Sequence, residues 1–135
     1  MVDITTVGEI LIDLTQTGIS DNGIPIYTAN PGGAPANVAV AASKLGAKTA
    51  FIGKVGNDSF GRFLCDTLKK YNVSTDGVIT DKSANTTLAV VSVNENGERS
   101  FAFYRKNSAD TLLSEYEIID LHLSNTHILH FGSVS

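Results

Sequence analysis

Two glycines and a proline stand directly before a helix pattern, between two runs of apolar residues. Residues 32–35 read "GGAP", a combination that suits a tight turn followed by a helix start. Apolar residues then follow at helical spacing, namely Val38, Ala41, Ala42 and Leu45. Gly46 supplies a stop, and the apolar, β-branched segments 4–14 and 48–55 each read as one buried strand. This order predicts a parallel sheet with covering helices.

The same alternation continues along the chain. "NDSFGRFLCDTLKKY" offers Asn57 or Asp58 as a helix cap. Its apolar stripe is Phe60, Phe63, Leu64, Leu68 and Tyr71. A short strand is expected at 76–80, a capping box over 114–117 starts a further helix, and 126–132 reads as another strand. The predicted class is therefore α/β.

Two hairpin signals interrupt this alternation of strands and helices. "DNG" at residues 21–23 and "NENG" at 94–97 each lie between segments that can extend. We expect the two hairpins to form a second, small antiparallel layer. Strand alternation places Phe101, Phe103 and Arg105 on one of its faces. A strand-end arginine is seldom part of a core, so we expect Arg105 to contribute little to stability.

Composition narrows the classes of function. The formal net charge is −4, and no basic cluster exceeds the Lys69–Lys70 pair, which disfavours nucleic acid as a partner. The chain has one cysteine, so an internal disulfide or a multi-cysteine zinc site is excluded. The N-terminal segment fits neither a secretory signal nor a membrane span. We therefore expect a cytoplasmic protein without a membrane partner, and we interpret its three histidines as structural.

Four residues near the glycine turn are candidates for a ligand site. Gly32 and Gly33 let a ligand approach the backbone at a helix start, although such a pair also occurs in ordinary turns. Asn37, one turn into the helix, can donate to and accept from hydroxyl groups, or can be a solvated helix residue. Asp13 is expected at the C-terminal end of the first strand, where open α/β sheets bind ligands, or it caps the next loop. Neither the P-loop nor the dinucleotide fingerprint is present.

Four segments, taken together and in order, resemble the ribokinase-like (PfkB) carbohydrate kinases, and within them the fructokinases. They are "GEILIDL" (8–14), "NPGGAPANVAVAASKLGAKTAFIGKVGNDSFG" (30–61), "NVSTDGV" (72–78) and "FAFYRKNSADTLL" (101–113). The resemblance implies a parallel sheet with helices on both faces and a small β lid. Residues 1–135 would be the N-terminal part of one sugar kinase domain, with lid segments at about 14–28 and 86–105.

The resemblance also implies roles for individual residues. Asp13 and Asn37 would hydrogen-bond sugar hydroxyls, Gly32 and Gly33 would give the sugar backbone access, and Phe103 and Arg105 would reach it from the lid. Two departures from ribokinase, Leu11 in place of an Asn and Ala34 in place of a Lys, argue against ribose as the substrate.

The implied activity is ATP-dependent phosphorylation of a sugar hydroxyl, D-fructose to fructose 6-phosphate. ATP, Mg²⁺ and a monovalent cation would be bound mainly by the C-terminal half that residues 1–135 lack. The catalytic base would lie there too, so these residues alone are expected to be inactive. The lid would also provide a homodimer contact. The alternatives are a kinase for 2-keto-3-deoxygluconate or another sugar, and a non-catalytic sugar-binding or association module.

Overall fold

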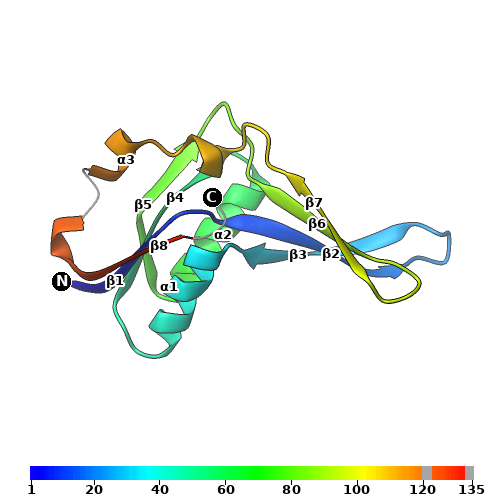
Figure 1. Ribbon diagram of the computed structural model, residues 1–135, viewed down its shortest axis with the longest axis horizontal. Coiled ribbons are helices and arrows are strands. Elements are labelled where there is room, and N and C mark those ends of the chain that lie inside the picture. Colours follow the sequence, from blue (N-terminus) through cyan, green and yellow to red (C-terminus); the bar gives the residue numbers. More distant parts are fainter. Residues whose placement is uncertain (120–122, 133–135) are drawn as a thin grey trace.

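A computed structural model describes residues 1–119 and 123–132, which form two sheets (Figure 1). The first sheet has four parallel strands in the order β5-β4-β1-β8. Their bounds are β1 Val2–Val7, β4 Thr49–Gly56, β5 Val73–Asp81 and β8 Thr126–Phe131. The α/β class and the parallel sheet predicted from the sequence are thus confirmed.

The second sheet is built from the two predicted hairpins, in the order β3-β2-β6-β7. Its strands are β2 Leu11–Ile19, β3 Pro25–Gly32, β6 Leu88–Val93 and β7 Arg99–Tyr104. Each hairpin is antiparallel, but β2 and β6 pair in parallel where the hairpins meet. The expected wholly antiparallel lid is therefore wrong, and the layer is a mixed sheet because both hairpins leave the body of the molecule in the same direction (Figure 1).

The expected single strand over 4–14 is also wrong, because this segment contributes to both sheets. β1 ends at Val7 and β2 begins at Leu11. Gly8 between them has φ 146°, and a Cβ there would lie 2.7 Å from Cγ of Pro35. A residue with a side chain could not adopt this bend against the helix without strain. Asp13 therefore lies inside β2 of the second sheet and not at the end of a core strand.

The two long helices share one hydrophobic core with one face of the parallel sheet. They are α1 Ala34–Lys44 and α2 Ser59–Lys70. The core consists of Ile10, Ile12, Ala36, Ala39, Phe51, Val55, Leu64, Leu68 and Val73. The sequence analysis placed Leu64, Leu68, Leu45 and Phe63 on the apolar stripes of the two helices. Leu64 and Leu68 are indeed buried, but Leu45 is 89% exposed and Phe63 is 43% exposed. In the alanine-rich α1, the small side chains of Ala36 and Ala39 face the sheet. The apolar stripe predicted for this helix, from Val38 to Leu45, was therefore wrong.

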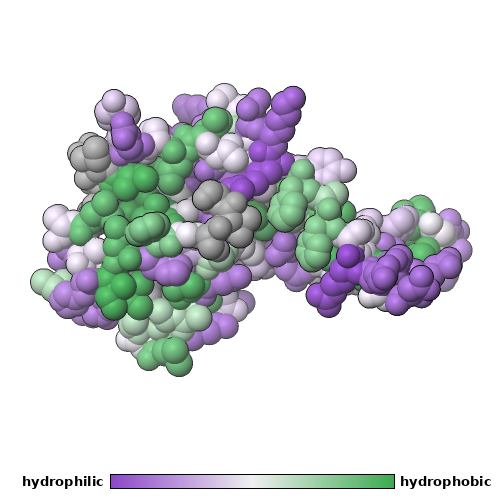
Figure 2. All heavy atoms as spheres, in the orientation of Figure 1, coloured by the Kyte–Doolittle hydropathy of each residue, from purple (hydrophilic) through white to green (hydrophobic). Residues whose placement is uncertain are grey.

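The other face of the parallel sheet carries the short elements that follow β7. These are η1 Ala109–Leu112, α3 Glu115–Ile119 and η2 Leu123–Asn125. Figure 2 shows hydrophobic residues gathered over the part of the molecule that holds this sheet. The edge strand β8 also carries three exposed apolar side chains, Ile128, Leu129 and Phe131. In the described part of the chain, no helix has the length and apolar character needed to span a membrane.

Candidate functional site

One face of the second sheet combines polar and aromatic side chains. The strand register places Asn30, Asp13, Ala89 and Phe103 in one row across β3, β2, β6 and β7. Residues directly opposite one another in a sheet point to the same face. The next row on this face is Thr28, Thr15, Val91 and Phe101. The face is therefore polar at β2 and β3 and aromatic at β7, where both phenylalanines are exposed.

Asp13 is the charged residue of these two rows; the next residue of β7 on this face is the exposed Arg99, opposite Val93. Within residues 1–119 and 123–132, the carboxylate of Asp13 has no hydrogen bond or ion pair. Burial raises the pKa of this carboxyl group. Gly32 lies diagonally across from it, and a Cβ at Gly32 would collide with Oδ2 of Asp13. The glycine thus leaves room for the carboxylate, and a half-buried carboxylate without a partner is suited to accept hydrogen bonds from a ligand.

Gly33 forms the start of α1 and is conformationally constrained. It is the N-cap of α1 with φ 107°, and a Cβ there would collide with the backbone oxygen of Glu9. Because glycine has no capping side chain, the cap comes from elsewhere: the Ala34 N–H donates to Oε1 of Glu9 at 3.2 Å. Glu9 is only 2% exposed. Its carboxylate lies at the N-terminus of α1, where the positive end of the helix dipole stabilises a negative charge. Sequence reasoning missed this carboxylate, which lies 25 residues from its partner.

Asn37 lies one turn into α1, where its N–H donates to the Gly33 carbonyl at 2.9 Å, and its side chain is exposed. A pocket of about 240 Å³ between α1, α2 and the end of β3 is lined by Gly32, Asn37 and mostly apolar neighbours. The structure thus brings Asp13, Gly32 and Phe103 to one sheet face, and Gly32 and Asn37 to one pocket. Gly32 belongs to both groups, whereas Phe103 does not line the pocket that contains Asn37.

Arg105 follows β7 and pairs with a carboxylate that the sequence analysis did not consider. Its Nε and Nη2 lie 2.9 Å and 2.8 Å from Oδ2 of Asp110, whose side chain is 1% exposed. Removing Arg105 would leave a buried charge without its partner, which is strongly destabilising. The expectation that Arg105 contributes little to stability was therefore wrong. The short spacing of Arg105 and Asp110 was the only signal in the sequence.

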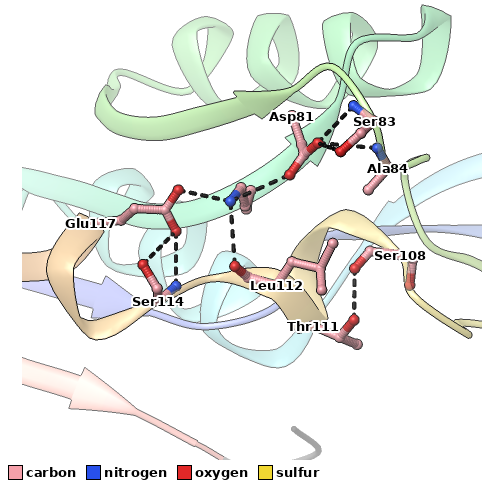
Figure 3. Close-up of polar contacts among 9 residues, drawn as sticks. Asp81, Ser83, Ala84, Ser108, Thr111, Leu112, Ser114 and Glu117 are labelled. Carbon is pink, nitrogen blue, oxygen red and sulfur yellow. Dashed lines mark hydrogen bonds and ion pairs between the residues drawn. The ribbon is translucent and has the colours of Figure 1, made fainter.

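A second polar cluster joins the sheet to the segment after β7. Nζ of Lys54, on β4, lies 2.7 Å from Oε1 of Glu117, 3.3 Å from Oδ2 of Asp81 and 3.3 Å from the Leu112 carbonyl oxygen. Figure 3 shows Asp81, Leu112 and Glu117 converging from three parts of the chain. The capping box predicted at 114–117 is confirmed, because the Ser114 N–H donates to Oε2 of Glu117 at 2.8 Å.

Both carboxyl groups of this cluster are held ionised. The hydrogen bond from Lys54 is the largest cause that lowers the pKa of Glu117 from its ordinary 4.5. Hydrogen bonds from the Ser83 N–H and hydroxyl, followed by Lys54, lower the pKa of Asp81 from 3.8 to about 2. A carboxyl group whose pKa is lowered by folding stabilises the folded state above its unfolded pKa. That contribution disappears as the pH falls through the folded pKa.

We therefore expect the free energy of unfolding to fall as the pH is lowered from 4.5 towards 2. In Lys54→Met the share of the Glu117 contribution that comes from Lys54 is lost, while the share from Ser114 remains, so the decline over this range becomes shallower. Urea denaturation at several pH values measures the slope, and Lys82→Met, which changes an exposed lysine, is the control. A slope in Lys54→Met as steep as in the unchanged protein would contradict the proposed coupling.

A third cluster fixes the start of the second hairpin to α2. The carboxylate of Asp58 caps α2 by accepting from the Gly61 N–H at 2.8 Å. It also accepts from the Thr86 N–H and hydroxyl, each at 2.8 Å. Burial by itself would raise the pKa of Asp58, but these hydrogen bonds hold it below its usual value. The predicted cap is confirmed, and it also positions the entry to β6.

Two of the three histidines, His127 and His130, lie in the described part of the chain. In residues 1–119 and 123–132, no group of three or more His, Cys, Asp or Glu side chains is arranged to hold a metal ion. His127 Nδ1 lies 3.7 Å from Oδ1 of Asp3 at the surface. His122, also predicted to be structural, lies outside the described residues.

Comparison with known proteins gives a consistent result over the whole chain. Residues 1–135 match the pfkB family of carbohydrate kinases. The chain is 48% identical over 130 residues to a probable fructokinase-7 of Arabidopsis thaliana, covering 95% of this chain and 38% of that relative. A crystal structure of fructokinase from Xylella fastidiosa matches with a TM-score of 0.89 at 40% identity, covering 96% of this chain and 40% of that one.

A further structural neighbour contains nucleotide. It is a protein from E. coli described as ribokinase II, in complex with ATP and Mg²⁺, with a TM-score of 0.86 at 28% identity. The match covers 97% of this chain and 42% of that chain. This chain thus spans about two fifths of the length of the proteins that it matches.

Proposed function

Because the chain belongs to the pfkB family of carbohydrate kinases, we propose that the whole protein transfers the γ-phosphoryl group of ATP to a hydroxyl of D-fructose, giving fructose 6-phosphate. Residues 1–135 would form the N-terminal part of the kinase domain, with the hairpins β2-β3 and β6-β7 as its lid. The observation that carries the proposal is the carboxylate of Asp13, which has no partner among the described residues, on a face that also carries exposed aromatic rings.

This face has the chemistry that a sugar needs. The carboxylate of Asp13 can accept hydrogen bonds from two hydroxyl groups, and the absence of a side chain at Gly32 keeps it accessible. The exposed ring of Phe103, two strands away in the same row, can pack against the apolar C–H face of a sugar. Gly33 and Asn37 would contribute polar groups from the start of α1, and Arg105 from the end of β7.

Residues 1–135 position the sugar in this proposal. Phosphoryl transfer depends chiefly on positioning and on stabilisation of the developing charge. ATP with Mg²⁺ supplies the phosphoryl group. We place the base that deprotonates the sugar hydroxyl, and most of the ATP site, in the part of the kinase that residues 1–135 do not include. No residue of this chain is assigned to Mg²⁺ or to a monovalent cation.

Partners and location are also part of the proposed function. Sugar and ATP are the small-molecule partners. A homodimer formed through the second sheet stays a prediction, which the exposed Tyr27, Phe101 and Tyr104 support. A cytoplasmic location, without nucleic acid or membrane as a partner, is likewise a prediction from the sequence.

The test uses the completed protein, that is, residues 1–135 joined to the remaining length that the relatives have. ATP-dependent ADP formation is measured with D-fructose, D-ribose, D-glucose and 2-keto-3-deoxygluconate. We expect the highest kcat/KM with fructose. A higher value with 2-keto-3-deoxygluconate would favour the alternative kinase. ADP formation with none of the sugars, together with retained sugar binding, would favour a non-catalytic module.

A further inference from the structure

Arg105 directly follows β7, two residues after Phe103 of the proposed sugar face. Its guanidinium does not stand alone, because Nε and Nη2 both contact Oδ2 of Asp110. The side chains of Arg105 and Asp110 are 19% and 1% exposed. A charge pair so well removed from water has its positive charge matched locally.

Asp110 is itself held in place by hydroxyl groups. Its Oδ1 accepts from the Thr87 hydroxyl and from the Ser108 hydroxyl, the latter at 3.3 Å. The Thr87 hydroxyl also lies 2.7 Å from that of Ser108. Thr87 directly precedes β6 and Arg105 directly follows β7, so Asp110 connects both ends of this hairpin. The carboxylate cannot turn away from Arg105 without losing these contacts.

The charges nearest the row of Asp13 and Phe103 then favour one kind of substrate; Arg99, an exposed cation of the same face, lies two rows away. Asp13 contributes a carboxylate with no partner in the described part of the chain, and the charge of Arg105 is already matched by Asp110. A sugar that carries a carboxylate would meet Asp13 as a like charge and would have to compete with Asp110 for the guanidinium. A neutral sugar has no such penalty, because its hydroxyl groups need hydrogen bonds and not a counter-charge.

We propose that Asp110 is a specificity-determining residue that restricts the kinase to neutral sugars by holding Arg105 in a charge-matched pair. This inference rests on the proposed function and deepens it. It predicts that removing the charge of Asp110 makes Arg105 available to a carboxylated sugar.

The experiment compares two substrates in one preparation of the completed protein, D-fructose as the neutral ketose and 2-keto-3-deoxygluconate as the carboxylated one. The measured quantity is the ratio of their kcat/KM values, from which any general loss of folded enzyme cancels. In the unchanged protein we expect fructose to be preferred. In Asp110→Asn we expect the ratio to shift towards the carboxylated sugar by about tenfold or more, the size of one relieved charge contact. Lys106→Gln, at an exposed lysine next to Arg105, should leave the ratio unchanged.

A second variant keeps the test decisive if Asp110→Asn does not fold. Thr87→Val removes one hydroxyl that holds the carboxylate and retains the volume, so the ratio should shift in the same direction by a smaller factor. An unchanged ratio in a folded variant, or a preference of the unchanged protein for the carboxylated sugar, would overturn the inference while the kinase activity stands. If the unchanged protein phosphorylates neither sugar, the proposed function fails and the inference fails with it.

Discussion

Asp13→Ala is expected to raise the KM for the sugar by about 10- to 150-fold in the completed protein, while the KM for ATP stays nearly constant. The range corresponds to the loss of hydrogen bonds to a charged group, worth about 1.5–3 kcal/mol. Steady-state kinetics with each substrate varied in turn measures both constants. Asp21→Ala, which removes an exposed carboxylate from the turn between β2 and β3, is the matched control.

The folding stability of Asp13→Ala is not expected to fall together with its affinity for the sugar. Burial raises the pKa of Asp13, so the ionised carboxylate opposes folding above its pKa and contributes no stability at neutral pH. We therefore expect Asp13→Ala to be at least as stable as the unchanged protein. A variant that loses stability and keeps its sugar KM would show that Asp13 is structural and would remove it from the site.

Gly33→Ala is expected to lower the free energy of unfolding by about 3 kcal/mol or more. Two costs act together: φ of 107° is strained for any residue with a side chain, and the new Cβ would collide with the backbone oxygen of Glu9, which cannot rotate away. The change should also disturb the cap that Glu9 provides to α1. Urea denaturation measures the loss.

The control for this prediction is Gly18→Ala. Gly18 lies in β2, its φ is not in the left-handed region, and a Cβ there meets no atom within 4 Å. We expect its effect to stay within about 0.5 kcal/mol, as at other open surface positions. Equal effects of the two substitutions would mean that Gly33 is not constrained in the way that the backbone geometry indicates.

Local sequence patterns were enough to predict most of the elements. "DNG" and "NENG" mark both hairpins, and Asp58 and the 114–117 capping box mark two helix starts, because these signals depend on residues close in sequence. The break at Gly8 could not be predicted in the same way. An apolar run from 4 to 14 looks like one strand, and the bend depends on Pro35, 27 residues later. The parallel pairing of β2 with β6 likewise arises only when the two hairpins meet.

The candidate site was predictable to a similar extent. The glycines and Asp13 were found by their residue types and by the family resemblance, and the structure places Gly32 directly beside Asp13. Long-range contacts beside the site and elsewhere in the fold were missed. Glu9 contacts α1 across 25 residues, and Lys54 contacts Glu117 across 63. Such contacts follow from tertiary packing and leave no periodic pattern in the sequence.

The most direct test of the central claim, that the face containing Asp13 binds the sugar, is a crystal structure of the completed protein with D-fructose bound. We expect a sugar hydroxyl within about 2.5–3.0 Å of an Asp13 carboxylate oxygen, the usual length of such a hydrogen bond. We also expect the sugar to lie over Gly32, where there is no side chain, with the ring of Phe103 on the same face. A sugar bound elsewhere in the protein, with the carboxylate of Asp13 in contact only with solvent, would contradict the account.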